Sequence, residues 1–191
     1  RGARVVLVSG PTSLEPPHGA EIIQVRSAEE MNDAVTSRVC RDKSSVDIVV
    51  MAAAVSDYTL AGGPQTSKIN RGREELALQL HPTVDILAKL GRWRAGRNGP
   101  VLVGFAAETD DLLGRARDKL RRKAVDFVVA NDVSLRGAGF AVDTNIATLV
   151  SRNEVEEVPL TSKRTLARII FDRVERCLGP LSAVKEAGTS T

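Results

Sequence analysis

Three strand-like segments of the sequence end in small residues followed by hydrogen-bonding side chains. They are VVMAAAVSDY (49–58), VLVGFAAETDD (101–111) and VVANDV (128–133). Ligands of parallel sheets bind at the carboxyl ends of strands, where alanines allow close approach and the polar groups beyond can recognise a base or sugar. Alternatively, the alanines only permit close helix packing and the acids cap helix N-termini, where negative charge is favoured. For one end alone the second explanation is the better one, but three ends on one sheet edge favour a ligand.

The stretch that follows the second of these ends predicts an amphipathic helix over residues 111–123 with one strongly basic face. That face carries Arg115, Lys119, Arg122 and Lys123, opposite an apolar stripe of Leu112, Ala116, Leu120 and Ala124. A solvated charged face is one explanation. However, only Asp118 offsets the six basic residues between Arg115 and Lys123, and a nearby anion such as a polyphosphate would relieve their repulsion.

A further cation, Lys68, lies in the Gly-, Pro- and Ser-rich stretch about ten residues after Asp57. This is a suitable distance for a flexible loop that closes over a site near the first strand end. Surface loops often carry a lysine, so the position of Lys68 matters more than its presence.

The elements that must position these residues alternate between apolar runs and amphipathic stretches. Strands are expected at 4–9, 21–25, 47–52, 101–105, 126–130 and 145–150. Helices are expected after the capping box of Ser27 and Glu30, at 84–93, at 111–123, and along the apolar face of Leu166, Ile169, Ile170, Val174 and Cys177. This order predicts an α/β fold, a Rossmann-like doubly wound and mostly parallel sheet with helices on both faces. We expect one domain over residues 1–179 and a disordered tail over 180–191.

Two further strands are expected in GAGFAVDTNIATLV (137–150) and NEVEEVPL (153–160), joined by a turn at Arg152 and Asn153. Such a hairpin at the end of the sheet leaves an apolar edge that a second copy of the chain would cover, which predicts a homodimer. The alternative is an ordinary edge protected by the C-terminal helix.

Composition narrows the possible partners of this 191-residue chain. Aromatic residues make up 3% of the sequence and the formal net charge is +3, so a nucleic-acid partner is not expected. Cys40 and Cys177 lack metal-ligand spacing and are expected to be buried thiols in a reducing cytoplasm. No apolar run approaches the roughly 20 residues of a membrane span, and no secretory signal is visible.

Familiar nucleotide fingerprints are missing from the sequence. No G-x-G-x-x-G follows a strand, which argues against a nicotinamide cofactor. Gly91 and Gly96 have the spacing of a phosphate-binding loop, but Arg97 and Asn98 stand where Lys and Ser or Thr belong. A non-catalytic nucleotide-binding or interaction module of Rossmann-like fold therefore remains the alternative to an enzyme.

Six segments in order resemble phosphopantothenoylcysteine synthetase, also called phosphopantothenate-cysteine ligase. They are MAAAVSDY with the nearby KI, PTVDIL, VGFAAET, ARDKLRRKAVDFVVANDV, GFAVDTNIATLV and, at the front, RVVLVSGPTSLEPPHGAEIIQVRSAEEM. The resemblance as a whole covers residues 4–178. This family is the ligase part of a bacterial bifunctional coenzyme A enzyme that also carries a flavin-dependent decarboxylase. The resemblance implies that 4'-phosphopantothenate is joined to cysteine with CTP and Mg²⁺, through an acyl-cytidylate, in a homodimer.

The resemblance also assigns roles to individual residues. The cytidine would be held by Ala53, Asp57, Asp85, Ile86, Phe105 and Ala106, and the phosphates by Lys119 and Lys123. Lys68 would be the mobile catalytic lysine that meets the developing negative charge and also binds the nucleotide. Asn131, at the third strand end, is the candidate for binding substrate. Mg²⁺ would bridge phosphate oxygens with few protein ligands, so no metal-binding residue is predicted.

The sequence departs from the family pattern at three places. The family has an additional front segment with an asparagine that contacts the acyl-cytidylate, and no asparagine lies between Arg1 and Arg26. Asn70 and Arg71 replace further lysines after Lys68, and PTVDIL holds one extra residue. We therefore expect a chain cut from a longer protein that binds CTP but completes the ligation poorly.

Overall fold

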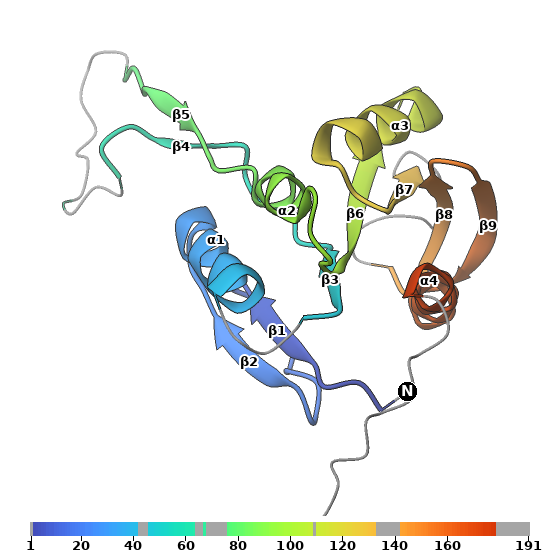
Figure 1. The fold of residues 1–191 in the computed structure, drawn as a ribbon. Helices are drawn as coiled ribbons and strands as arrows, with labels where there is room; N and C mark the ends of the chain where they lie inside the picture. Colours follow the sequence, from blue (N-terminus) through green and yellow to red (C-terminus); the bar gives the residue numbers. More distant parts are fainter. Residues whose placement is uncertain are drawn as a thin grey trace, which may run out of the picture. The chain divides into compact units, whose positions relative to one another are not determined.

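The computed structural model describes residues 2–41, 46–63, 67, 76–108, 110–132 and 142–178. The chain divides into two compact units, whose elements are labelled in Figure 1. The single domain expected over residues 1–179 stays a prediction. The first unit comprises residues 1–45 and 53–93, and the second comprises residues 46–52 and 94–191. The predicted tail, 180–191, lies outside the described residues.

The second unit is built on a five-stranded sheet in the order β3-β6-β7-β8-β9. Its strands are β3 (Ile48–Met51), β6 (Val101–Glu108), β7 (Phe127–Asp132), β8 (Thr144–Ser151) and β9 (Val155–Ser162). The first three strands are parallel, and β8 and β9 form the predicted antiparallel hairpin. The expected α/β fold class is confirmed, and the hairpin turn falls at Arg152 and Asn153 as predicted.

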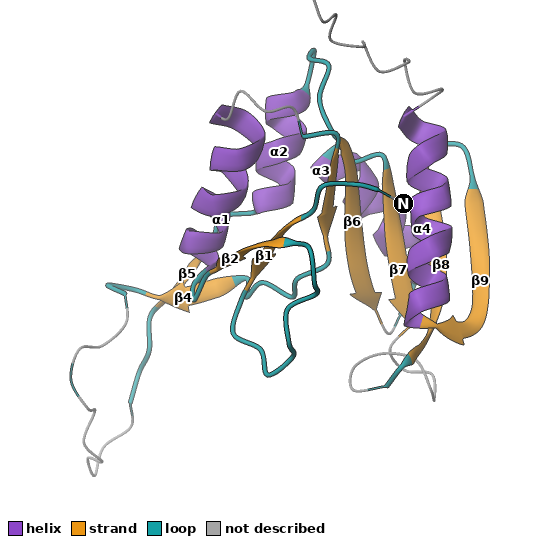
Figure 2. Ribbon diagram, turned by 90° about the horizontal axis from the view of Figure 1, so that it is seen from below, coloured by secondary structure: helices purple, strands orange, loops and turns teal. Residues whose placement is uncertain are grey.

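Two helices cover opposite faces of this sheet (Figure 2). They are α3 (Leu112–Lys123), which buries Ala116 and Leu120, and α4 (Lys163–Leu178), which buries Leu166, Ile170 and Val174. The α4 face contains the main apolar cluster, where the side chains of Phe127, Val129 and Leu149 have no exposed surface. Because helices cover both faces of the sheet, its strands are apolar on both sides and therefore rich in Val and Leu.

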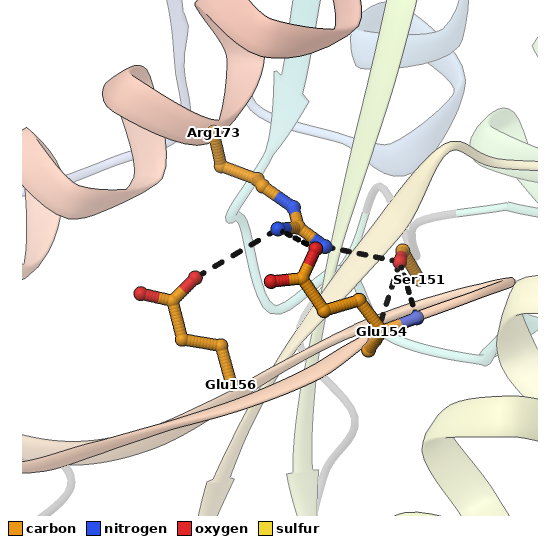
Figure 3. Close-up of polar contacts among 4 residues, drawn as sticks. All are labelled: Ser151, Glu154, Glu156 and Arg173. Carbon is orange, nitrogen blue, oxygen red and sulfur yellow. Dashed lines mark hydrogen bonds and ion pairs between the residues drawn. The ribbon is translucent and has the colours of Figure 1, made fainter.

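A charged cluster joins α4 to the hairpin (Figure 3). The buried Arg173 guanidinium forms an ion pair with Glu154, donates to Ser151 Oγ at 3.1 Å and lies 3.9 Å from Glu156 Oε2. The Ser151 hydroxyl also accepts from the Glu154 backbone N–H at 3.2 Å. Arg173 on α4 therefore contacts the hairpin turn and holds it next to the helix.

The first unit contains two small sheets and two helices. The strands β1 (Val6–Ser9) and β2 (Glu21–Gln24) pair in parallel, and β4 (Tyr58–Leu60) and β5 (Leu80–Pro82) pair antiparallel. The helices are α1 (Ala28–Thr36), continued by a π-helical turn, η1 (Ser37–Arg41), and α2 (Ile86–Arg94). Among the described residues β1 and β2 pair only with each other, not within the larger sheet as predicted. Apolar runs predict strands but do not encode which strands pair.

The predicted start of α1 is confirmed. Ser27 caps the helix by accepting from the Glu30 backbone N–H at 3.0 Å, and the Glu30 carboxylate accepts from the Arg26 N–H at 2.7 Å. The reciprocal bond of a standard capping box therefore falls one residue earlier than usual. Met31 and Val35 are buried on the inner face of the helix, as their spacing predicted.

The prediction that both cysteines are buried is wrong. Cys40 is partly buried, and Cys177 is exposed at the last turn of α4, beyond the buried Val174. Partial burial, together with the negative charge of Asp126, raises the pKa of the Cys177 thiol. None of the helices in the described part of the chain has the length and apolar character needed to cross a membrane.

Candidate functional site

The three strand ends singled out from the sequence lie at one edge of the larger sheet. Because β3, β6 and β7 are adjacent and parallel, their carboxyl ends point the same way. The strand β6 is longer than predicted and runs through Ala106 and Ala107, which pair with Ala130 and Asn131 of β7. Ala106 is only 2% exposed, so the alanines at this end allow close packing as well as close approach.

Lys119 and Phe105, two of the predicted site residues, are in direct contact. The Lys119 ammonium, from α3, donates to the backbone carbonyl oxygen of Phe105 in β6. The Phe105 side chain is partly buried against the apolar cluster, and the Lys119 side chain is also partly buried. The basic face of α3 is therefore not uniformly solvated, because one of its lysines reaches the end of a central strand.

Lys123, also partly buried, comes one turn later on α3, which ends at Ala124 in a left-handed conformation with φ 50°. Elsewhere on the helix Asp118 forms an ion pair with Arg121, and both side chains are largely exposed. Asp118 thus offsets Arg121, not the two lysines that were predicted to bind phosphate.

Asn131 occupies an unusual position near the end of β7. In the sheet register it lies between Ala107 of β6 and Ala147 of β8. Its Oδ1 atom is buried and accepts no hydrogen bond from any residue that the structure describes. Buried polar atoms are nearly always satisfied by protein or water, so this oxygen needs an explanation.

In the first unit, the structure brings Asp57 next to the segment that contains Asp85. The Thr83 backbone N–H donates to the Asp57 carbonyl oxygen at 2.8 Å, and the Thr83 hydroxyl donates to the Ser56 carbonyl oxygen at 2.5 Å. Both carboxylates lie in exposed residues. Thr83 was missed from the sequence, although a threonine between two predicted nucleotide-binding acids could have indicated such a bridge.

Asp85 and Asp111 each cap a helix, which for Asp111 is the alternative explanation considered for the strand ends. The Asp85 carboxylate accepts from the Ala88 N–H at 3.0 Å at the start of α2, and the Asp111 carboxylate accepts from the Gly114 N–H at 3.2 Å at the start of α3. Ile86 is buried, so its side chain contributes to the interior of the first unit. Helix capping thus accounts for part of what the acids at these positions do.

The first unit also contains a pocket of about 460 Å³ at the ends of β1 and β2, which the sequence analysis did not foresee. Its lining includes the predicted Ala53 and the polar side chains of Ser9, Thr12, Arg26 and Ser56. Two features of the sequence could have indicated this pocket: the SGPT turn after the first strand, and the capping box at Ser27. The capping box places the start of a helix at the pocket. This volume is within the range of small-molecule sites.

The remaining predicted residues divide between the two units. Ala53, Asp57, Asp85 and Ile86 belong to the first, and Phe105, Ala106, Lys119, Lys123 and Asn131 belong to the second. The predicted catalytic Lys68 lies outside the described residues. The described part of the chain contains no group of three or more His, Cys, Asp or Glu side chains that could hold a metal ion.

A comparison with protein families assigns the chain to one of them. The family described as DFP, the DNA/pantothenate metabolism flavoprotein C-terminal domain, matches residues 1–178. The chain belongs to this family. The resemblance inferred from the sequence is therefore confirmed.

Curated relatives match nearly the same part of the chain. The coenzyme A biosynthesis bifunctional protein CoaBC of Bacillus subtilis (strain 168) is 46% identical over 178 residues, which cover 91% of this chain and 41% of that protein. A cysteine/cysteine sulfinic acid decarboxylase from an unknown prokaryotic organism is 39% identical over 180 residues, covering 91% of this chain and 47% of that protein. The chain thus spans less than half the length of these curated relatives.

A solved structure of a DFP-related domain has the same fold. The crystal structure of the C-terminal domain of coenzyme A biosynthesis bifunctional protein CoaBC superposes with a TM-score of 0.71 at 36% identity, covering 93% of this chain and 76% of that one. The Rossmann-like architecture predicted from the sequence is thereby confirmed.

Proposed function

We propose that this chain is a phosphopantothenate-cysteine ligase domain of coenzyme A biosynthesis that uses CTP. The observation that carries the proposal is membership of the DFP family over residues 1–178, with the parallel strand ends of β3, β6 and β7 at one sheet edge. The bifunctional relatives support coenzyme A biosynthesis as the pathway and a flavin-dependent decarboxylase as a partner domain. Cytoplasmic location follows as part of the same proposal.

In this proposal the substrate carboxylate attacks the α-phosphorus of CTP, pyrophosphate leaves, and an acyl-cytidylate forms. The amino group of cysteine then attacks the acyl carbon, and CMP leaves with the electrons of the broken C–O bond. Neither step needs a covalent catalyst from the protein, but both need cations around phosphate oxygens. Lys119 and Lys123 are the proposed phosphate ligands, and Lys68 would meet the charge that develops at the α-phosphate.

Recognition of the cytidine is assigned to Ala53, Asp57, Asp85, Ile86, Phe105 and Ala106 on the strength of the sequence resemblance. Asp57 and Asp85 offer exposed carboxylates that can accept from an amino group or a ribose hydroxyl. Since Ile86 and Ala106 are buried, their contribution would come from backbone groups or from packing. Mg²⁺, when bound with CTP, would neutralise triphosphate charge, and with no described cluster of protein ligands it would be held mainly by phosphate oxygens.

The proposed function is tested by thermal unfolding of the chain with CTP, ATP or NAD in the presence of Mg²⁺. Only a ligand that binds the folded state raises the melting temperature, and at 100 times its Kd the stabilisation is about 2.7 kcal/mol. CTP should raise it clearly, while ATP and NAD should raise it much less. Equal shifts with CTP and ATP would contradict CTP recognition, and a shift with NAD alone would favour a dinucleotide-binding domain. CTP binding without turnover in any form would favour the non-catalytic module.

We further propose that the 191-residue polypeptide by itself binds CTP but turns over slowly. No asparagine is present between Arg1 and Arg26 to position phosphopantothenate, and a modest misplacement of reacting groups can cost about 100-fold in rate. Pyrophosphate release from CTP and 4'-phosphopantothenate should therefore be near background. A form extended upstream with the family's asparagine-containing segment should be much faster, whereas full-rate turnover by the unextended chain would contradict the proposal.

A homodimer through the β8–β9 hairpin is also proposed. Among the described strands, β9 is the last of its sheet, and Val155 and Leu160 on it are exposed. Pairing with a second copy would cover this apolar edge. Sedimentation at micromolar concentration should give the mass of two chains, and the mass of one chain would reject the dimer.

A further inference from the structure

Arg94 binds three groups at the amino end of the larger sheet. It is the last residue of α2 and belongs to the second unit. Its guanidinium donates to the Pro100 carbonyl oxygen at 2.9 Å and to the Ala124 carbonyl oxygen at 2.8 Å, and it forms an ion pair with Asp126. Pro100 directly precedes β6, Ala124 directly follows α3, and Asp126 directly precedes β7. One side chain therefore joins the end of α3 to the starts of two adjacent strands.

Two further features fix the position of this guanidinium. The Asp126 carboxylate also accepts from the Leu102 backbone N–H at 2.7 Å, which anchors the ion pair to β6. A β-carbon on Gly99 would lie 2.7 Å from Arg94 Cγ, closer than β-carbons approach other atoms in folded proteins. The aliphatic part of the arginine side chain therefore lies against the turn before β6, at a position where only glycine leaves enough room.

The helix α3 depends on polar contacts more than α4 does. Of its twelve residues, only Ala116 and Leu120 are buried, whereas α4 buries three apolar side chains and Arg173. The helix also ends at Ala124 with φ 50°, a left-handed conformation that glycine adopts far more readily than alanine. Apolar packing alone therefore specifies the position of α3 along the sheet weakly.

Polar contacts hold α3 against β6 at two levels. Near the carboxyl end of the strand, the Lys119 ammonium donates to the Phe105 carbonyl oxygen. At the amino end, Arg94 holds the Ala124 carbonyl oxygen, and its positive charge suits the C-terminus of a helix. If the second contact is lost, the helix can shift along the strand, and Lys119 shifts with it.

We propose that Arg94 is a positioning residue for phosphate binding, a proposal that rests on the proposed CTP-dependent ligase function. By holding the end of α3, Arg94 places the Lys119 ammonium near the carboxyl end of β6, where the triphosphate would bind. Arg94 lies at the opposite end of these strands, so its effect on the ligand passes through α3.

The test removes the guanidinium with Arg94→Ala, and Arg92→Ala, at an exposed position of α2, is the matched control. Calorimetry at a temperature at which each variant is folded should show that Arg94→Ala weakens CTP binding about three- to tenfold. The upper bound is the roughly tenfold loss expected when the Lys119 ammonium itself is removed. Cytidine binding should be nearly unchanged in Arg94→Ala, and both ligands should bind Arg92→Ala normally. Gly99→Ala, which displaces the arginine side chain without removing its charge, is the second variant if Arg94→Ala does not fold.

A double-mutant cycle with Lys119→Ala separates positioning from a general loss of stability. If Arg94 acts through Lys119, Arg94→Ala should weaken CTP binding little further once residue 119 is alanine. The same loss in both backgrounds would overturn the inference. Equal losses for CTP and cytidine, unchanged CTP binding, or an equal effect of Arg92→Ala would overturn it as well.

Hydrogen exchange tests the position of α3 without any ligand. The N–H groups of Ala124 and Val125 donate to the carbonyl oxygens of Arg121 and Leu120, each at 3.3 Å, in the last turn of the helix. Arg94→Ala should speed their exchange several-fold, and Arg92→Ala should not. Unchanged exchange in Arg94→Ala would overturn the positioning role alone. If the parent chain binds no CTP, the proposed function has failed, and the exchange rates still decide whether Arg94 holds α3 in place.

Discussion

The five-stranded sheet and the β1–β2 pair are built from strands of similar composition but differ in burial. In the larger sheet Leu102, Val128 and Leu149 have no exposed surface. In β1 every residue is only partly buried, and β2 ends in the exposed Gln24. Valine-rich sequence thus predicts a strand in both regions, but complete burial requires neighbouring strands on both sides and helices on both faces.

The two units also differ in the chemistry they contribute. The second unit supplies an ammonium group at a strand end and an amide whose oxygen is buried, whereas the described part of the first supplies exposed carboxylates and a pocket whose lining includes several hydroxyl groups. We therefore expect stability and phosphate binding to depend mainly on the second unit, and the carboxylate contacts with the ligand to come from the first.

The largest expected effect is a loss of unfolding free energy when a side chain is truncated in the larger sheet, compared with a truncation in the first unit. Phe127→Ala in β7 removes a fully buried ring and should lower the free energy of unfolding by about 3–5 kcal/mol. Leu80→Ala in β5 removes a side chain that is 55% exposed and should change it by less than about 0.5 kcal/mol. Urea unfolding measures both. Equal losses would mean that burial does not distinguish the regions.

The next largest effect is expected in ligand affinity, when a lysine of the second unit or an aspartate of the first is replaced by alanine. Lys123→Ala in α3 should weaken CTP about tenfold or more but leave cytidine nearly unchanged, because a charge-assisted phosphate contact contributes roughly 1.5–3 kcal/mol. Lys119→Ala should do the same and also lose the contact with the Phe105 carbonyl. Asp57→Ala in the first unit should weaken CTP and cytidine equally.

Titration calorimetry with both ligands measures these affinities. The matched control is Arg117→Ala, which removes one positive charge from an exposed position of the same helix. If Arg117→Ala weakens CTP as much as the lysine variants do, the basic face acts only through its general charge. If CTP binding is unchanged in both lysine variants, the basic face of α3 does not bind phosphate and is only a solvated surface.

A smaller effect concerns the cluster that joins α4 to the hairpin. Arg173→Ala leaves Glu154 and Glu156 without their shared cation and should cost about 1–3 kcal/mol of unfolding free energy. This is less than the cost for a fully buried pair, because the Glu154 side chain is 52% exposed. Arg176→Ala, at an exposed position of the same helix, is the control and should be nearly neutral. A neutral Arg173→Ala would show that apolar packing alone fixes α4 to the sheet.

The smallest expected effect compares the two cysteines, one in each unit. The pKa of the exposed Cys177 thiol is raised, so below that pKa the folded chain holds less thiolate than the unfolded chain does. In a Cys40→Ser background, iodoacetamide should therefore alkylate Cys177 more slowly in the folded chain than in urea. Because the folded form binds the proton more tightly, the stabilisation from this thiol is present below its unfolded pKa and is lost as the pH rises through its folded pKa. Equal rates in the folded and unfolded chains would contradict the raised pKa.

Much of the larger sheet could be predicted from the sequence. The alternation of apolar strands and amphipathic helices predicted β3, β6, β7 and α3 to within a few residues, and the turn at Arg152 and Asn153 predicted the β8–β9 hairpin. These elements were predictable because their apolar positions repeat with periods of 2 or 3.6, which local sequence records directly. The short strands β4 and β5 were missed, because three residues each are too few to show a period.

The candidate site was predicted less completely. Acids and alanines at strand ends were visible as types, but whether an acid caps a helix or faces a ligand depends on backbone geometry several residues away. Asp85 and Asp111 cap helices, for example, which the sequence offered only for Asp111, as an alternative to ligand binding. The contact of Thr83 with the Asp57 segment joins residues 26 positions apart and has no local pattern.

By itself the sequence determined the family and the fold class, because both are recorded in residue types and their spacing; the site residues it indicated stay predictions. Only the tertiary structure decided which strands pair, which face of the sheet each helix covers, and that the amide oxygen of Asn131 is buried without a donor among the described residues. Burial and pairing are properties of neighbours that are distant in the chain. The contacts of Lys119 with Phe105 and of Arg173 with the hairpin likewise join residues 14 to 22 positions apart, so their partners could not be identified from local spacing.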